Sequence, residues 1–338
     1  YAIVAADQAI ADAALDNEGV DKNRVGVIFA AGIGGLHTFE EEAGYYAKNE
    51  EKGPKYNPFF IPKMISDIAA GHISINHEFR GPNFGTVSAC ASSNNALIDA
   101  FNYIRLGMAD AIVTGGAEAA ITVGGVAGFS AMRAISTRND DPQGASRPFS
   151  KSRDGFVLGE GGAALILEEY EHAVARGAHI YAELVGYGLN CDAYHITAPD
   201  PSGETPAACF VNAIKDAGMK PEDIDYINVH GTSTPLGDVA ELKAVQGLFG
   251  EHAYKMNISS TKSMTGHMLG AAGGVELIAS ALALKHGIVP PTINYKEPDP
   301  ECDLNYVPNK AVKVDITMAA SNSLGFGGHN ACVVLKKV

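Results

Sequence analysis

Two stretches of the chain follow the same plan, and this internal repetition constrains the fold more than any other feature. An alanine-rich helical pattern, a short polar connector and a buried strand ending at glycine occupy residues 6–32, and the same order returns at residues 210–231. Short apolar runs that alternate with helix-length segments are typical of βαβ units and a parallel sheet. The sequence therefore predicts an α/β protein built from two similar halves.

The repetition also suggests where the halves divide. We expect an N-terminal half at residues 1–178 and a C-terminal half at 179–338. Residues 36–86 and 121–156 interrupt the alternation, and we expect these loop-rich stretches to form the walls of a pocket. The second half has a strand-like run at 180–190 before its first helix, whereas the first half begins inside a helix. We therefore expect the first half to lack its N-terminal strand.

Composition narrows the class of protein. Of the 338 residues, 46% are hydrophobic, which is enough for a large core. No apolar run is as long as a membrane span, so we expect a cytoplasmic protein without membrane contact. The net charge of −14 argues against general affinity for nucleic acid. The five cysteines are scattered and form no C-x-x-C pair, so neither a disulfide framework nor a structural zinc site is expected.

One cysteine has an environment that favours reactivity. Cys90 lies in "GTVSACASSNNALIDAF", where a strand-like run ends and a helical pattern begins. Backbone N–H groups at a helix start stabilise a thiolate and hold a developing oxyanion. We therefore expect Cys90 to have a lowered pKa and to act as a nucleophile. The alternative is a buried cysteine that acts only as a small hydrophobic residue.

Two histidines are placed to serve that nucleophile. His230 follows a predicted parallel strand, at the sheet edge where α/β proteins place their sites. His267 opens a helix in the second half, at the place that Cys90 occupies in the first. If the halves are related by an approximate twofold axis, the two helix starts converge, and a thiol meets an imidazole. For a lone histidine, a structural role in a turn is the alternative.

The motifs together resemble a known family. "HGTSTPLGD" from His230, "TKSMTGHMLGAAG" from Thr261 and "NSLGFGGHN" from Asn322 are similar to the β-ketoacyl-acyl carrier protein synthases, condensing enzymes with the thiolase fold. The synthase II group of type II fatty-acid synthesis is the most similar. The resemblance implies two pseudo-symmetric halves in αβαβα layers, with the missing N-terminal strand in the middle of the first sheet. It also implies a homodimer and the absence of any cofactor or metal.

The resemblance implies a role for each motif residue. It makes Cys90, His230 and His267 the catalytic set of a decarboxylative Claisen condensation, in which malonyl-acyl carrier protein extends an acyl chain held on Cys90 by two carbons. The other implied roles are an active-site lysine, Lys262, supported by Glu276; an oxyanion hole from the N–H groups of Cys90 and Phe326; phosphopantetheine contacts from Thr232 and Thr234; and an acyl tunnel lined by Phe129 and Ile33 and gated by Phe326.

The carrier protein that the resemblance implies as partner is acidic, so a basic docking patch is required even on this acidic chain. Lys55, Lys63 and Arg133, on the pocket-wall stretches, are the candidates. Three other functions stay open at this point. They are a polyketide-type ketosynthase, a catalytically silent partner subunit, and a cysteine hydrolase that needs no malonyl substrate.

Overall fold

The computed structural model describes residues 1–338 and contains two mixed β-sheets. The first sheet has the order β2-β1-β3-β4, from strands Asn83–Thr86, Val25–Ala30, Ala111–Glu118 and Gly161–Glu168. The second has the order β5-β11-β10-β6-β7, from strands Glu183–Cys191, His329–Lys336, Met318–Gly325, Tyr226–Asn228 and Asn257–Ser259. Ile288–Val289 (β8) and Val312–Lys313 (β9) form a separate small ribbon.

The sheets repeat one pairing pattern, which supports the predicted symmetry of the halves. In the first sheet, β1 pairs parallel with β2 and β3, and β3 pairs antiparallel with β4. In the second, β6 pairs parallel with β7 and β10, and β10 pairs antiparallel with β11. The expected parallel pairing is present around β1 and β6, and each sheet also contains antiparallel pairing that was not predicted. Only three residues separate β10 from β11, too few for the crossover that a parallel pair requires.

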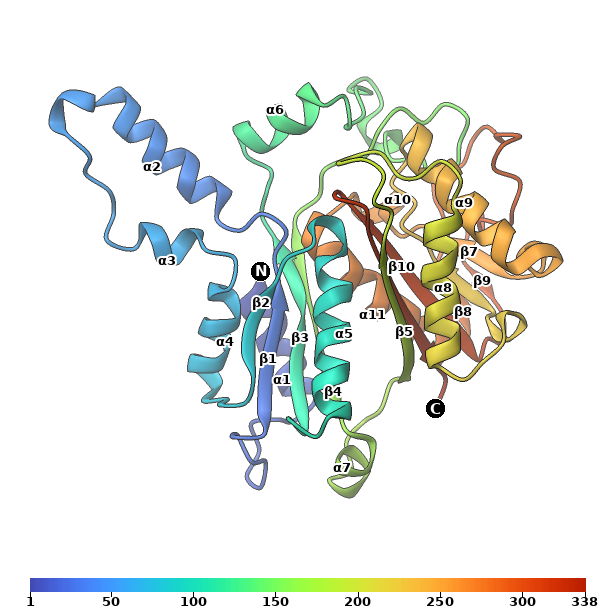
Figure 1. The fold of residues 1–338 in the computed structure, drawn as a ribbon, viewed down its shortest axis with the longest axis horizontal. Coiled ribbons are helices and arrows are strands. Elements are labelled where there is room, and N and C mark those ends of the chain that lie inside the picture. Colours follow the sequence, from blue (N-terminus) through green and yellow to red (C-terminus); the bar gives the residue numbers. More distant parts are fainter.

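Helices complete five αβαβα layers, as the resemblance implied (Figure 1). Helices α1 (Ala2–Asp12) and α4 (Ile68–His77) pack on the first sheet, and α5 (Ser92–Arg105) and α11 (Ala272–His286) pack against each other and contact both sheets. Helix α8 (Glu204–Asp216) packs on the second sheet, with α9 (Pro235–Phe249) beside it. The remaining helices are α2 (Leu36–Lys48), α3 (Phe60–Met64), α6 (Val123–Ala131), α7 (Tyr170–Ala175) and α10 (Lys262–Thr265).

The central helices approach closely because small residues lie between them. Ser92, Ser93 and Ala96 of α5 are fully buried. On α11, a Cβ added at Gly273 would lie 2.6 Å from Oδ1 of Asn94. A larger side chain at Gly273 would therefore force the two helices apart, which explains the small residues in the first turn of α11.

Two expectations for the first half need correction. Residues 36–86 are not mainly loop: they contain α2, α3, α4 and strand β2, and α2 and α3 project from the body (Figure 1). As expected, strand β5 of the second sheet has no counterpart in the first sheet. However, β5 lies at the edge of its sheet beside β11, so by symmetry the corresponding place is the edge beside β4 and not the middle of the sheet.

None of the helices combines the length and the apolar character that crossing a bilayer requires.

Candidate active site

The predicted nucleophile lies in a strained turn between a strand and a helix. Cys90 is the middle residue of a 3₁₀ turn, Ala89–Ala91, which joins β2 to α5. Ala89 has φ +51°, a left-handed conformation that an L-residue adopts at a cost of roughly 1–2 kcal/mol. This sharp turn directs the Cys90 side chain towards the second half, and the residue is 7% exposed.

The second half has the same turn, but His267 is not its equivalent of Cys90. Leu269–Ala271 forms a 3₁₀ turn before α11, and Leu269 has φ +48°. Gly270 is therefore the positional equivalent of Cys90, and His267 lies three residues earlier. His267 is held instead by its backbone, since its N–H donates to the carbonyl oxygen of Val157 at 2.7 Å. The predicted correspondence is wrong, although the predicted convergence occurs.

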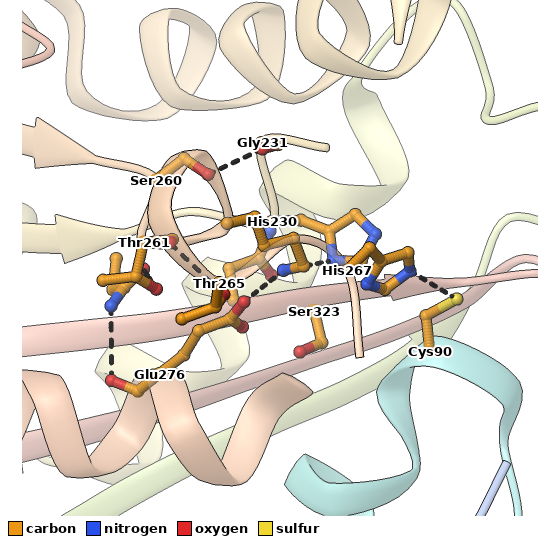
Figure 2. A network of polar contacts seen from close by, with 12 residues as sticks. Cys90, His230, Gly231, Ser260, Thr261, Thr265, His267, Glu276 and Ser323 are labelled. Atoms are coloured by element: carbon orange, nitrogen blue, oxygen red, sulfur yellow. Dashed lines mark hydrogen bonds and ion pairs between the residues drawn. The ribbon is translucent and has the colours of Figure 1, made fainter. Parts of the chain in front are cut away.

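The three predicted catalytic side chains meet in one place. Nε2 of His267 lies 3.0 Å from Cys90 Sγ, the contact drawn in Figure 2. The rings of His230 and His267 are 5.2 Å apart and nearly perpendicular. One ligand atom from each of the three residues lies within 4.8 Å of the others. This arrangement brings a thiol and two imidazoles onto one reacting centre.

Burial determines the charge of all three groups. It raises the pKa of the Cys90 thiol to about 12, although the Lys262 charge and the Phe326 backbone N–H act to lower it. The expected lowered pKa is therefore wrong, because loss of water outweighs the dipole of a short turn. Burial and the Lys262 charge also hold the pKa of both histidines well below its usual value. The resting site contains a neutral thiol and two neutral imidazoles.

A buried ion pair lies behind His230. The Lys262 ammonium pairs with Glu276 of α11, and both side chains are nearly inaccessible to water. Lys262 Nζ also lies 3.4 Å from Nδ1 of His230. An ammonium can only donate, so Nδ1 accepts and the ring proton is on Nε2. The support of Lys262 by Glu276 that the resemblance implied agrees with this ion pair, and the catalytic role of Lys262 stays a prediction.

Glu241 of α9 was not predicted from the sequence. It accepts the backbone N–H of His230 at 2.7 Å, that of Gly231 at 2.8 Å and the Asn322 amide at 2.9 Å. These bonds fix the backbone on which His230 stands. No signal in the sequence indicated this role, since only the folded chain buries this face of α9 against the end of the strand that precedes His230.

The thiol and imidazoles open into a cavity of about 380 Å³. Its lining includes four predicted substrate contacts, Thr232, Thr234, Phe129 and Phe326. Ser233, between the two threonines, has φ +74° and is fully buried. The hydroxyls of Thr232 and Thr234 lie 3.1 Å apart. Ile33 does not line the cavity, and its side chain is 41% exposed. The resemblance implied that Ile33 lines an acyl tunnel, but the structure does not place it there.

The predicted docking residues do not form one patch. Arg133 is exposed, has no carboxylate partner and lies at the cavity. Lys55 lines a separate shallow hollow with Glu41 and Glu42, and Lys63 is exposed on α3, outside the cavity lining. Of the three, only Arg133 lines the cavity that reaches Cys90, and the docking role of each stays a prediction.

The thiol and the two imidazoles are also the one group of side chains whose spacing suits a metal ion. Three ligands with a fourth position open to substrate is a common zinc arrangement. Here, however, Lys262 faces Nδ1 of His230 and leaves the proton on Nε2, the atom that would have to bind the metal. The cluster is better suited to hydrogen bonding than to metal binding, and the absence of a cofactor stays a prediction.

Comparison with known proteins identifies the family. The family model described as β-ketoacyl synthase, N-terminal domain, matches residues 1–173, and the model for the C-terminal domain matches residues 181–296. The chain belongs to the β-ketoacyl synthase family. It is 54% identical over its whole length to 3-oxoacyl-[acyl-carrier-protein] synthase 2 of Staphylococcus aureus, of which it covers 81%. It is 51% identical to the synthase of that name from Synechocystis, of which it covers 80%.

Solved structures of β-ketoacyl synthases have the same fold. One is the structure of a type II PKS acyl-carrier protein in complex with its ketosynthase bound to the hexaketide. A chain of that complex matches this chain with a TM-score of 0.97 at 38% identity. The match covers 100% of this chain and 84% of that one. A β-ketoacyl synthase from Burkholderia phymatum matches with a TM-score of 0.91 at 37% identity, covering 100% and 81%.

Proposed function

We propose that this β-ketoacyl synthase uses Cys90 to hold an acyl chain while malonyl-acyl carrier protein is decarboxylated and condensed with it. The observation that carries the proposal is the 3.0 Å contact between Cys90 Sγ and His267 Nε2, with the His230 ring on the same cavity. No other cysteine has a histidine nitrogen in hydrogen-bond contact with its sulfur.

The first half-reaction transfers the acyl group. The Cys90 sulfur attacks the thioester carbonyl as its proton moves to His267, because a thiol with a raised pKa needs a base at the moment of attack. The carbon–sulfur bond to phosphopantetheine then breaks, and that thiol takes the proton. The backbone N–H groups of Cys90 and Phe326 stabilise the tetrahedral oxyanion.

The second half-reaction forms the new carbon–carbon bond. Loss of carbon dioxide from the malonyl group leaves an enolate, and the Nε2–H of His230 donates to its oxygen. His267 Nδ1 contacts no other polar atom, so neither tautomer is imposed and this ring can supply a second donor. The enolate carbon attacks acyl-Cys90, the β-ketoacyl thioester leaves, and the Cys90 thiolate is reprotonated from solvent.

The remaining parts of the cavity suit the rest of the substrate. We assign Thr232 and Thr234 to the phosphopantetheine arm, and Phe129 and Phe326 to the acyl chain, because all four line the cavity that reaches Cys90. Identity of 54% to a synthase 2, against 38% to a polyketide ketosynthase, favours fatty acyl substrates over polyketide intermediates. The contact between the Cys90 sulfur and His267 argues against a silent partner subunit. The homodimer and the cytoplasmic location stay predictions.

The proposal is tested by supplying acyl carrier thioester with and without malonyl carrier. With malonyl carrier, we expect one carbon dioxide released for each β-ketoacyl product, two carbons longer, seen by mass spectrometry. Without it, release of carrier thiol should stop after one equivalent, because the acyl group remains on the enzyme. Continuous release of free acid in the absence of malonyl carrier would contradict the proposal and indicate a cysteine hydrolase.

Arg133 provides a second test, of how the acidic carrier docks. Arg133→Glu should raise KM for carrier-bound substrate about fivefold or more, since a charge at an interface rim is reversed, and change KM for a small-molecule thioester less than about twofold. Lys255→Glu, an exposed reversal with no side-chain partner, is the matched control and should change neither value. An equal rise for both substrates in Arg133→Glu would remove Arg133 from the docking surface.

A further inference from the structure

A third buried carboxylate, not used in the reaction above, lies where the two halves meet. Glu118 is the last residue of β3 and is 3% exposed. Its Oε2 accepts the backbone N–H of Gly32 at 2.7 Å and that of Gly270 at 3.1 Å, and its Oε1 accepts the N–H of Ile33 at 3.2 Å. Gly32 and Ile33 follow β1 in the first half, whereas Gly270 belongs to the turn before α11 in the second.

The contact of Glu118 with Gly32 and Gly270 leaves no space for a side chain at either glycine. A Cβ added at Gly32 would lie 2.5 Å from Glu118 Oε2, and one added at Gly270 would lie 2.9 Å from that oxygen and 2.3 Å from the Gly32 nitrogen. Ser93 of α5 also donates its hydroxyl to the Gly270 carbonyl oxygen. The turn that begins two residues after His267 is thus fastened to the half that carries Cys90.

The carboxylate has no cationic partner. No ion pair of the structure includes Glu118, and only backbone N–H groups compensate its burial. Burial raises the pKa of Glu118, and those N–H groups oppose the rise. Its charge in turn acts to raise the pKa of the Cys90 thiol. A negative group is therefore placed near the nucleophile without neutralisation.

We propose that Glu118 is a positioning residue of the condensation: its three backbone contacts set the His267 segment against the Cys90 segment, and its charge adds to burial in keeping Cys90 a thiol until His267 takes the proton. The inference rests on the proposed role of Cys90. A neutral amide has only one acceptor oxygen and would satisfy the three N–H donors from the two loops less completely, and an aliphatic residue would leave all three unpaired. The function is thus divided between the length of the side chain and its charge.

Two variants separate length from charge. Glu118→Gln keeps the length and removes the charge, whereas Glu118→Asp keeps the charge and withdraws the oxygens by about 1.5 Å. Iodoacetamide labelling between pH 7 and 9.5 would be followed on the Cys90 peptide, because the exposed Cys191 would be labelled as well. Steady-state kcat and KM would be measured in parallel, with exposed Glu251→Gln as control.

We expect Glu118→Gln to label about threefold faster or more at every pH, because removal of a nearby negative charge increases the thiolate fraction. Glu118→Asp should label within about twofold of wild type. Both variants should lose about tenfold in kcat with little change in KM, since His267 is displaced from the sulfur. Equal acceleration of labelling in both variants would indicate general loosening and overturn the charge role.

Gly270→Ala disrupts the same contact from the opposite side and keeps the proposal testable if Glu118→Gln does not fold. It should lower kcat without faster labelling. A kcat within about twofold of wild type in Glu118→Asp and Gly270→Ala would overturn the positioning role. Wild-type acylation at Cys90 is measured independently, so failure here is distinct from failure of the proposed function.

Discussion

Cys90→Ala is expected to gain no acyl group when incubated with acyl carrier thioester, whereas intact wild-type protein gains the mass of one acyl chain. Condensation should fall by at least about 10³-fold, because Cys90 is the only cysteine that lines the cavity. Intact-protein mass spectrometry measures the first effect, and product formation from malonyl carrier the second. The substitution removes one small side chain, so the fold should be retained.

Cys191→Ser is the matched control for this experiment. Cys191 is the exposed cysteine, and its sulfur contacts only the Gly327 carbonyl oxygen. That variant should acylate like the wild type. Acyl mass on Cys90→Ala that disappears in a Cys90→Ala, Cys191→Ser double variant would show that the wrong cysteine had been assigned.

Lys262→Met is expected to have the second largest effect, on stability as well as on catalysis. It leaves the Glu276 carboxylate buried without its cation, which costs about 3–5 kcal/mol of the free energy of unfolding. It also removes the donor to His230 Nδ1, so the ring proton no longer has to be on Nε2 and kcat should fall about 100-fold. Guanidinium denaturation and steady-state kinetics measure the two effects.

The double variant Lys262→Met, Glu276→Leu separates the two consequences. It removes both charges, so stability should return to within about 1–2 kcal/mol of wild type, while kcat stays low. Lys337→Met is the control, because Lys337 forms a 2.9 Å ion pair with Asp315 at the surface and should cost less than about 1 kcal/mol. Recovery of kcat together with stability in the double variant would contradict a role for Lys262 in orienting His230.

Local patterns in the sequence predicted much of the fold and the centre of the site. The strands before Gly32 and Gly231 and the helix after Cys90 follow from short-range pattern. The approach of His267 to Cys90 was expected from the repetition, and the grouping of both with His230 from the family resemblance. The structural equivalence of Cys90 with Gly270 was missed because a left-handed residue, Ala89 or Leu269, leaves no mark in the amino-acid types.

What the sequence could not provide depends on contacts between distant segments. The pKa of Cys90 is set by burial under the second half, which outweighs the turn that the sequence does show. Glu118 and Glu241 bind backbone N–H groups 85–152 and 10–11 positions away, and backbone donors have no sequence signature. Likewise, Lys55 and Arg133 are both basic residues on predicted pocket walls, and only the folded structure shows that Arg133 alone lines the cavity.

The paired turns at Ala89–Ala91 and Leu269–Ala271 have a consequence for how the active centre is divided. Each half has the same turn, but the first turn presents the Cys90 side chain, whereas the second, at Gly270, presents only peptide groups. A nucleophilic side chain at position 270 would collide with the Gly32 nitrogen. The close contact that aligns the two halves therefore prevents the second turn from carrying a nucleophile. A symmetric scaffold of this kind supports one reaction centre and not two.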